Sequence, residues 1–242
     1  DLFPQNSMLN IIGIGLNDEK DVSVKGLELI QSSDFIYLEN YTSRLQCSLE
    51  DLEKFYGKKV ILVEREFVEN GKEMIEKSKT QNVSLLIIGD VFSATTHISL
   101  YQDGINAKLE INIINNASVL NAVGITGLSL YKFGKTTSIS FHDSEVPTKV
   151  IKDNFPLHTL CLLDLTPKEN KFMESSTAIE RLISQGLDPE KKVIVCVQLG
   201  SKNTQIIYSS AKDVKPLNKY PQCLIIPGEL HFMEEEFLEN FK

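Results

Sequence analysis

Apolar runs with the length of a β-strand alternate with segments of helical periodicity along the chain. Alternation of this kind is typical of α/β folds, in which helices cover a sheet of buried strands. The pattern begins with the strand Met8–Ile14, a helix over residues 23–32 and the strand Phe35–Leu38, which together predict a βαβ unit. Because strands buried on both faces suit parallel pairing, we expect a mostly parallel sheet in this half of the chain.

Two local signals place the first helices. Val24, Leu27 and Ile30 recur at three-residue steps, so we expect them on one face of the helix 23–32. Ser48 is followed three positions later by Asp51, an N-cap arrangement that predicts the start of the next helix. The other elements expected in this half are the strand Lys59–Val63, a helix near Asn70–Lys79, the strand Val83–Gly89, a helix near Thr95–Gln102 and the strand Leu109–Ile114.

The second half of the chain contains closely spaced strands, which predict mixed or antiparallel pairing. Its expected elements are the strands Thr136–Phe141 and Thr159–Leu165, a helix near Ser175–Gln185, and the strands Lys192–Leu199, Gln205–Ser210 and Gln222–Pro227. The change of pattern places a join near Asn115–Asn116, so we expect two α/β domains, residues 8–116 and 117–242. Residues 1–7 are interpreted as an N-terminal extension or expression remnant that precedes Met8.

Composition and charge argue against several classes of protein. No apolar run approaches the ~20 residues that a membrane-spanning helix needs. The formal charge of −8 opposes binding to nucleic acid or to an anionic membrane surface. The four cysteines lack CxxC spacing and the four histidines lack metal-ligand spacing, so we predict neither disulfides nor a metal site. The N-terminus lacks the features of a signal peptide, which favours a cytoplasmic location.

A glycine turn follows the first predicted strand. Gly13 and Gly15 allow a sharp turn and a close approach of a ligand, as in dinucleotide-binding loops. Asp18 stands where such loops have their third glycine, and its charge would repel a pyrophosphate. Glu39, at the end of the second strand, is the kind of acid that binds a ribose. From spacing alone, a tight turn without any ligand is about as well supported.

The segment "IIGDVFSATTH" at 87–97 changes from a buried strand to small and polar residues. Ligands of open α/β sheets gather at the carboxyl ends of strands, so Asp90, Ser93, Thr95 and Thr96 are candidates to line a cleft. A carboxylate and hydroxyls without a cation suit a neutral or positive ligand such as a ribosyl sulfonium. The alternative is that Ser93 or Thr95 only caps the following helix.

A similar segment, "NNASVLN" at 115–121, follows the fifth strand, and in isolation Ser118 is more simply interpreted as an N-cap. The chain has no HExxH, GxSxG or P-loop motif, so hydrolytic and NTP-cleaving mechanisms have no support. We interpret each histidine as a hydrogen-bonded structural residue. Glu234-Glu235-Glu236 is expected to form a solvated helix face.

Several segments together resemble the diphthine synthases, methyltransferases of the diphthamide pathway. The segments that carry the resemblance are "LNIIGIGLNDEKDVSVKGLELIQSSDFIYLENYTS" at 9–43, "FYGKKV" at 55–60, "IIGDVFSATTH" at 87–97, "NNASVLNAVGITGLSLYKFGKTTSI" at 115–139, "LHTLCLLDL" at 157–165 and "LIIPGELHFME" at 224–234. The resemblance implies a tetrapyrrole-methylase-like fold, with S-adenosylmethionine in a cleft between two α/β domains, and a homodimer. It also implies methylation of a modified histidine of elongation factor 2, to which eukaryotic members add a methyl ester.

The resemblance further implies which residues contact the cofactor. In the first domain they are Leu16, Asp90, Ser93, Ser118 and Val119, and in the second they are Leu163, Leu199 and Gln222. S-adenosylhomocysteine would be the product, and no metal is implied. No residue is assigned as a general base, and the catalytic residues are left unassigned.

This sequence departs from the family pattern in three places. Asn17 replaces a third glycine, Ser93 stands where some members have glycine, and the chain is shorter than typical members after Phe141 and after Glu169. Three other functions stay open: a methyltransferase acting on a small tetrapyrrole, a dinucleotide-dependent oxidoreductase and a nucleoside-binding module without turnover.

Overall fold

A computed structural model describes residues 7–93 and 97–242 and divides the chain into two compact units, 1–119 and 120–242. The join predicted near Asn115–Asn116 lies shortly before this division. Most of the segment interpreted as an N-terminal extension, residues 1–6, lies outside the described residues, as do Thr95 and Thr96. Each unit is described by itself below.

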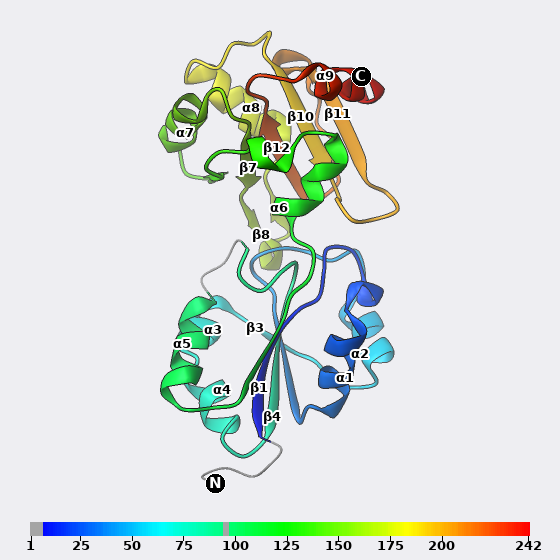
Figure 1. Cartoon of the computed structure of the whole chain (residues 1–242), viewed down its shortest axis with the longest axis vertical. Helices are drawn as coiled ribbons and strands as arrows, with labels where there is room; N and C mark the ends of the chain where they lie inside the picture. The colour runs from blue at the N-terminus through cyan, green and yellow to red at the C-terminus, as the bar shows by residue number, and fades with distance from the viewer. Residues whose placement is uncertain (1–6, 94–96) are drawn as a thin grey trace. The chain divides into compact units, whose positions relative to one another are not determined.

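The first unit is built on a parallel sheet with strand order β3-β2-β4-β1-β5 (Figure 1). Its strands are β1 (Met8–Gly13), β2 (Phe35–Glu39), β3 (Ile61–Val63), β4 (Asn82–Ile87) and β5 (Ile111–Ile114). Both the predicted strands and their parallel pairing are therefore confirmed. Because all these strands run in one direction, their carboxyl ends meet at a single edge of the sheet.

Helices cover both faces of this sheet. The helices are α1 (Val24–Ser32), α2 (Leu49–Tyr56), α3 (Arg65–Asn70), α4 (Lys72–Lys77) and α5 (Ile98–Asn106). Alternate residues of β1 serve the two layers: Ile12 packs with α1 and α2, while Leu9 and Ile11 pack with α3, α4 and α5. Figure 1 shows these two helical layers on opposite sides of the strands. The period-two alternation of a strand thus produces a sheet with a core on each face.

Local signals explain where these helices begin and end. Ser48 and Asp51 form the expected capping box at the start of α2. The helix predicted near Asn70–Lys79 corresponds to α4. The sequence patterns missed α3, which ends at Gly71, where a positive φ of 61° separates it from α4. The expected apolar face of α1 is also partly wrong: Ile30 is buried, but Val24 is 75% exposed, and Gly26 packs against the sheet instead.

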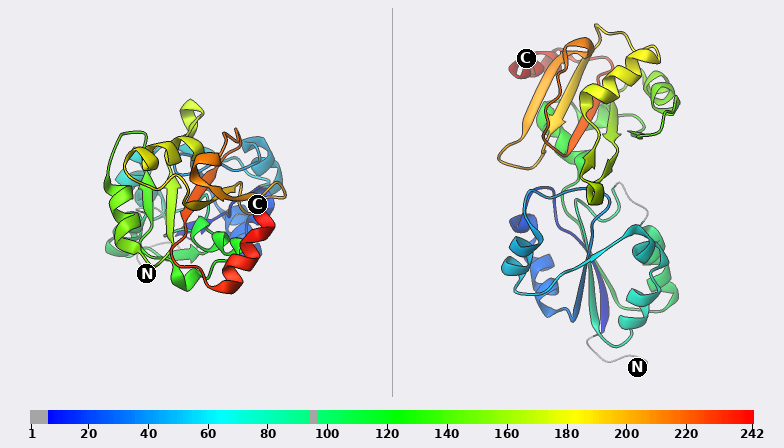
Figure 2. Two further views of the ribbon diagram at one scale, coloured as in Figure 1. Left: turned by 90° about the horizontal axis from the view of Figure 1, so that it is seen from above. Right: turned by 180° about the vertical axis from the view of Figure 1, so that it is seen from behind.

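The second unit contains a mixed sheet with strand order β11-β10-β12-β7-β6, seen from behind in Figure 2. Its strands are β6 (Thr137–Ile139), β7 (Thr159–Leu163), β10 (Lys192–Val197), β11 (Gln205–Ser210) and β12 (Gln222–Ile226). All neighbours are antiparallel except β6 and β7. A separate small hairpin joins β8 (Leu165–Thr166) to β9 (Lys171–Phe172). Mixed pairing in this half is therefore confirmed.

The core of the second unit lies between the sheet and α8 (Ser175–Ser184), whose Ala178, Ile179 and Leu182 are buried. The other helices of this half are α6 (Val119–Ala122), α7 (Val146–Asn154) and α9 (Phe232–Leu238). The N-cap interpretation of Ser118 and the helix face expected at residues 234–236 agree with α6 and α9, whereas α7 was not predicted. The segments after Phe141 and Glu169 are short connections, to α7 and to β9 respectively. No described helix has the combination of length and apolar character that crossing a bilayer requires.

Candidate active site at the strand ends

Three loops meet at the carboxyl edge of the first sheet, after β1, β4 and β5. Gly15 and Gly89 form a two-way backbone bridge, with N···O distances of 3.2 and 2.7 Å. A Cβ atom at Gly13 would lie 2.7 Å from the carbonyl oxygen of Gly89, so only glycine permits this approach. The glycines of the predicted turn therefore bring the ends of β1 and β4 into direct contact.

Asp90 joins the loops after β4 and β5. Its Oδ1 accepts hydrogen bonds from Asn116 N at 2.9 Å and Asn115 Nδ2 at 3.0 Å, and its Oδ2 accepts one from Ser93 Oγ at 3.0 Å. Burial alone would raise the pKa of Asp90, but these donors outweigh it and lower the pKa below its ordinary value. The carboxylate of Asp90 is therefore charged and links the loop after β4 to the loop after β5. The sequence did not reveal this role.

Asp21 and Asn116 join Gly13, Gly15, Gly89, Asp90 and Ser93 in what we call the strand-end cluster. The sequence patterns missed the role of both Asp21 and Asn116. Asp21 Oδ2 accepts hydrogen bonds from the backbone N–H groups of Leu16 and Asn17, at 3.1 and 2.7 Å. Asn116 Nδ2 donates to the carbonyl oxygens of Gly13 and Asp21, at 3.0 and 2.9 Å. Asn17 does not adopt a positive φ, so it does not imitate a third glycine. A carboxylate four or five residues after a glycine turn was the signal available for Asp21.

The cluster brings together the residues predicted for the first domain. Gly89 has φ of 88°, and a Cβ atom there would lie 3.8 Å from Leu16 Cδ2 and 4.0 Å from Ser118 Cα. Ser93 belongs to the same cluster because its hydroxyl donates to Asp90. Val119 follows directly as the first residue of α6. The positive φ of Gly89 therefore shapes the turn after β4 that brings these predicted residues close together.

The residues predicted for the second domain also gather at one edge of their own sheet. Gln222 begins β12 opposite Val197 of β10. Leu163 ends β7 opposite Ile139, one residue beyond Leu162, which pairs with Cys223. Leu199 follows the end of β10. Three of the four polar contacts of the Gln222 side chain are with Ser175 and Glu174, so its amide is already used within the unit. Any ligand contact of Gln222 would therefore come from its main chain.

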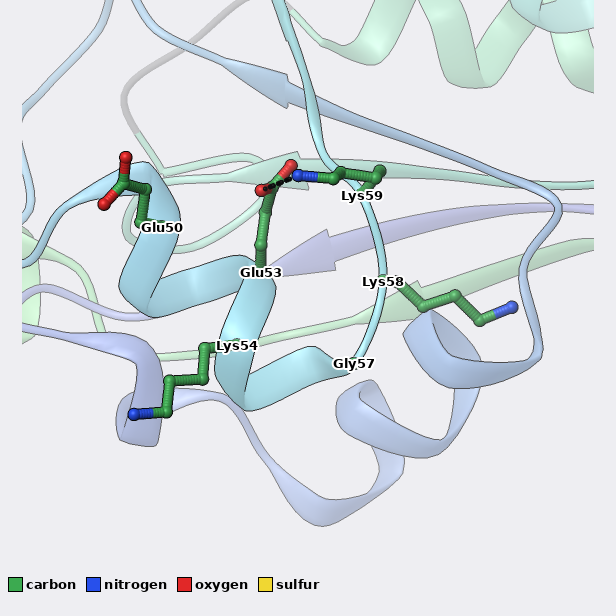
Figure 3. Close-up of a pocket in the computed structure, with 6 residues that line it drawn as sticks. All are labelled: Glu50, Glu53, Lys54, Gly57, Lys58 and Lys59. Atoms are coloured by element: carbon green, nitrogen blue, oxygen red, sulfur yellow. Dashed lines mark hydrogen bonds and ion pairs between the residues drawn. The ribbon is translucent and has the colours of Figure 1, made fainter.

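A hollow beside the end of α2 is a weaker candidate (Figure 3). Glu50, Glu53, Lys54 and Lys59 line it, and Glu53 Oε2 pairs with Lys59 Nζ at 2.8 Å. This hollow precedes β3 and so lies at the amino end of that strand, away from the edge where ligands of α/β sheets bind. It is best explained as a charged surface feature.

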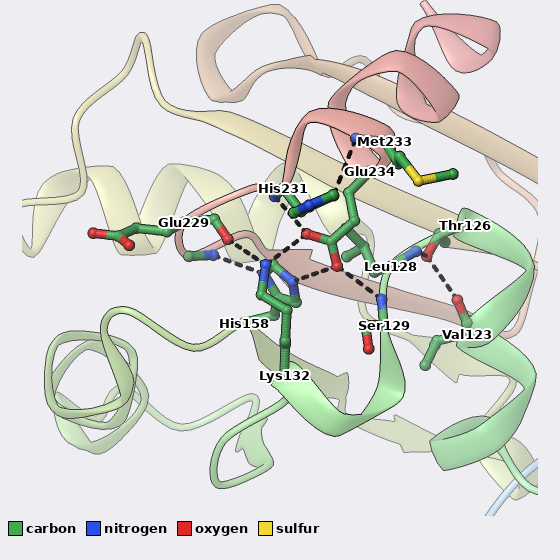
Figure 4. Close-up of polar contacts among 11 residues, drawn as sticks. Val123, Thr126, Leu128, Ser129, Lys132, His158, Glu229, His231, Met233 and Glu234 are labelled. Atoms are coloured by element: carbon green, nitrogen blue, oxygen red, sulfur yellow. Dashed lines mark hydrogen bonds and ion pairs between the residues drawn. The ribbon is translucent and has the colours of Figure 1, made fainter.

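Glu234 forms a second polar cluster, shown in Figure 4. The predicted solvated face holds for Glu235 and Glu236, which are exposed, but is wrong for Glu234, which is buried. Its carboxylate is buried and accepts hydrogen bonds from Lys132 Nζ at 2.6 Å, His231 N at 2.8 Å and Ser129 N at 2.9 Å. His158 Nδ1 accepts a hydrogen bond from Gly228 N, so Nε2 carries the proton that faces Glu234 Oε1 at 3.4 Å. The interpretation of His158 as a structural residue is confirmed.

Within the described ranges, no group of three or more histidine, cysteine, aspartate or glutamate side chains could hold a metal ion. The family model of the tetrapyrrole (corrin/porphyrin) methylases matches residues 8–215. Together with the two α/β units, this match defines the chain as a methyltransferase of that class, which uses S-adenosylmethionine.

Similarity to known proteins identifies the family within this class of methyltransferases. A diphthine methyl ester synthase of Dictyostelium discoideum is 39% identical and is aligned over 97% of this chain and 98% of its own length. A diphthine synthase of Methanocaldococcus jannaschii is 40% identical over 96% of this chain and 98% of its own. A crystal structure of diphthine synthase matches with a TM-score of 0.91 at 36% identity, covering 97% of this chain and 96% of that one. The chain belongs to the diphthine synthase family.

Proposed function

We propose that the chain transfers methyl groups from S-adenosylmethionine to the modified histidine of elongation factor 2, as a step of diphthamide biosynthesis. The observation that carries the proposal is the family-wide similarity over nearly the full length, combined with the strand-end cluster. A small-tetrapyrrole substrate and a nicotinamide cofactor have no comparable support. We place this activity in the cytoplasm, where the substrate would be available.

The strand-end cluster fits the proposed cofactor. Its polar side chains are the carboxylates of Asp21 and Asp90 with amides and a hydroxyl, and no lysine or arginine takes part in their described hydrogen bonds. A strand-end cluster with carboxylates and without cations suits the positive sulfonium and the ribose of this cofactor, and it disfavours a pyrophosphate. In this proposal Leu16, Ser118 and Val119 bind the cofactor.

The bound cofactor would supply an electrophilic methyl group. The chain's own residues then have to orient the nucleophile, exclude water and accept a proton where the nucleophile is an amine. A carboxylate nucleophile, as in the formation of a methyl ester, releases no proton. S-adenosylhomocysteine is the expected product.

A direct test incubates the protein with S-adenosylmethionine that carries a radioactive methyl group. Elongation factor 2 with the aminocarboxypropyl-histidine intermediate should become labelled, whereas fully modified elongation factor should not. Labelling of a precorrin-type tetrapyrrole in place of the elongation factor would assign the substrate to the other branch of the class. Binding of a nicotinamide cofactor with no methyl transfer would contradict the proposal entirely.

We also propose that the chain forms a homodimer through an apolar surface of the second unit. Tyr131, Phe232 and Met233 are 98%, 68% and 62% exposed. The Lys132–Glu234 ion pair holds the segment that contains Tyr131 beside α9. Exposed apolar patches of this kind support an interface. Light scattering should give the mass of a dimer for the wild-type chain and that of a monomer for Tyr131→Glu; an unchanged dimer would place the interface elsewhere.

A further inference from the structure

Glu39 ends β2 at the same carboxyl edge as the strand-end cluster, and its side chain is fully buried. Its Oε1 accepts a short hydrogen bond from the hydroxyl of Thr42, and the carboxylate also accepts backbone hydrogen bonds from Ile88 and Tyr41. Ile88 precedes Asp90 by two residues, so Glu39 lies beside the β4 end of the candidate active site. Within the described part of the chain, Oε2 has no hydrogen-bond partner.

Burial raises the pKa of Glu39 to about 7, although the hydrogen bonds from Thr42 and the backbone oppose this change. The neighbouring groups ionise far from neutrality. Burial and the charge of Glu39 raise the pKa of Tyr41, whose ring lies under Arg65 at 5.0 Å. Burial lowers the pKa of His97, which contacts the Tyr41 hydroxyl at 3.4 Å, to about 4. Among these groups, Glu39 is the one suited to exchange protons near pH 7.

This inference rests on the proposed function, in which methyl transfer to an amine requires a proton acceptor. An amine attacks a methyl group only after it has lost a proton, and the positively charged product of each transfer must lose another before the next. We propose that Glu39 accepts this proton through the hydroxyl of Thr42, which is only half-buried and donates a hydrogen bond to the enclosed carboxylate.

The substrate ammonium gives a proton to Thr42 Oγ1, while the Thr42 hydroxyl gives its own proton to Glu39, which becomes a neutral carboxylic acid. The free amine then forms the N–C bond as the S–C bond breaks, and the electron pair of that bond stays on sulfur. Glu39 releases the proton to solvent before the next transfer.

A rival explanation is that Glu39 only shapes the 41–42 turn by accepting its hydrogen bonds. The two roles differ in their dependence on pH, so the test measures single-turnover N-methyl transfer between pH 5.5 and 9, with cofactor affinity measured in parallel. The range is chosen to span about two units to either side of neutrality. The variants are Glu39→Gln, which keeps the shape of the side chain, Thr42→Val, which removes only the hydroxyl, and Thr42→Ser, which restores it.

The wild-type rate should rise through a pKa near that of Glu39. Glu39→Gln and Thr42→Val should lose this rise and transfer methyl groups about a hundredfold more slowly at pH 7, with unchanged affinity for S-adenosylhomocysteine, while Thr42→Ser should recover most of the rate. Wild-type rates and pH dependence in Glu39→Gln would overturn the role of Glu39 and leave the proposed function standing. A wild-type protein that methylates no elongation factor would overturn both.

Discussion

Replacement of Glu234 by glutamine tests whether the buried cluster of the second unit is a major source of its stability. Burial alone would raise the pKa of Glu234, but the hydrogen bonds from Lys132, His231 and Ser129 outweigh it and lower the pKa from 4.5 to about 2. Each pH unit between those two values corresponds to about 1.4 kcal/mol, so the ionised carboxylate stabilises the unit by about 3 kcal/mol at pH 7. Glu234→Gln should remove most of this, because an amide cannot accept from all the same donors.

The sign of the pH dependence follows from the lowered pKa. Stability from Glu234 is fully present above the pKa of the unfolded chain, near 4.5, and is lost as the pH falls towards 2. The difference in unfolding free energy between wild type and variant should therefore shrink on acidification.

Hydrogen exchange resolved by peptide suits this measurement, because the chain has no tryptophan and the method reports on the second unit by itself. Backbone amides of β7 and β12 should exchange faster in Glu234→Gln than in the wild type. The factor should correspond to the stabilising free energy that the Glu234 carboxylate no longer supplies. Glu236→Gln is the matched control, since Glu236 lies on the same helix and is exposed, and it should change stability by less than about 0.5 kcal/mol. Equal effects of the two substitutions, or a Glu234 effect that does not vary with pH, would refute the reasoning.

Three further predictions concern the strand-end cluster and the core. Asp90→Ala should weaken binding of S-adenosylmethionine about tenfold or more, because it releases the loops after β4 and β5; calorimetry with unchanged affinity and normal circular dichroism would exclude Asp90 from the site. Gly13→Ala should lower both affinity and stability, since its Cβ would lie 2.7 Å from a carbonyl oxygen, whereas Gly124→Ala meets only ordinary contacts and should melt normally. Cys161 and Cys196 should resist thiol reagents in the folded protein, because burial raises the pKa of Cys161 to about 12 and a hydrogen bond with Cys223, together with burial, raises the pKa of Cys196; rapid labelling of both under native conditions would contradict their place in the core.

The main strands were predictable because each coincides with an apolar run of strand length in the sequence. The apolar runs that become β1, β4 and β10 are nearly unbroken, and the Ser48–Asp51 capping box is visible within four residues. Short helices such as α3 and α7 have too few residues to show a clear helical period, so they were missed.

Side-chain roles that depend on distant partners could not be predicted. Glu234 looks like part of an acidic surface, and only the fold brings Lys132 and Ser129 to it across about a hundred residues. The resemblance to a family named Asp90 as a cofactor contact, but the hydrogen bonds from Asn115 and Asn116 that give it a positioning role arise only when β4 and β5 lie in one sheet. The sequence pattern therefore predicted the position of the candidate site at the carboxyl ends of the strands, but not the hydrogen bonds that build it.

The most direct test of the central claim is mass spectrometry of the elongation factor 2 peptide that contains the modified histidine, after incubation with this protein and S-adenosylmethionine. The account predicts successive additions of one methyl mass to that single side chain. Alkaline treatment should remove one methyl group if an ester is formed and none if only the amine is methylated. An unmodified peptide in the presence of folded protein and bound cofactor would contradict the assignment of this substrate.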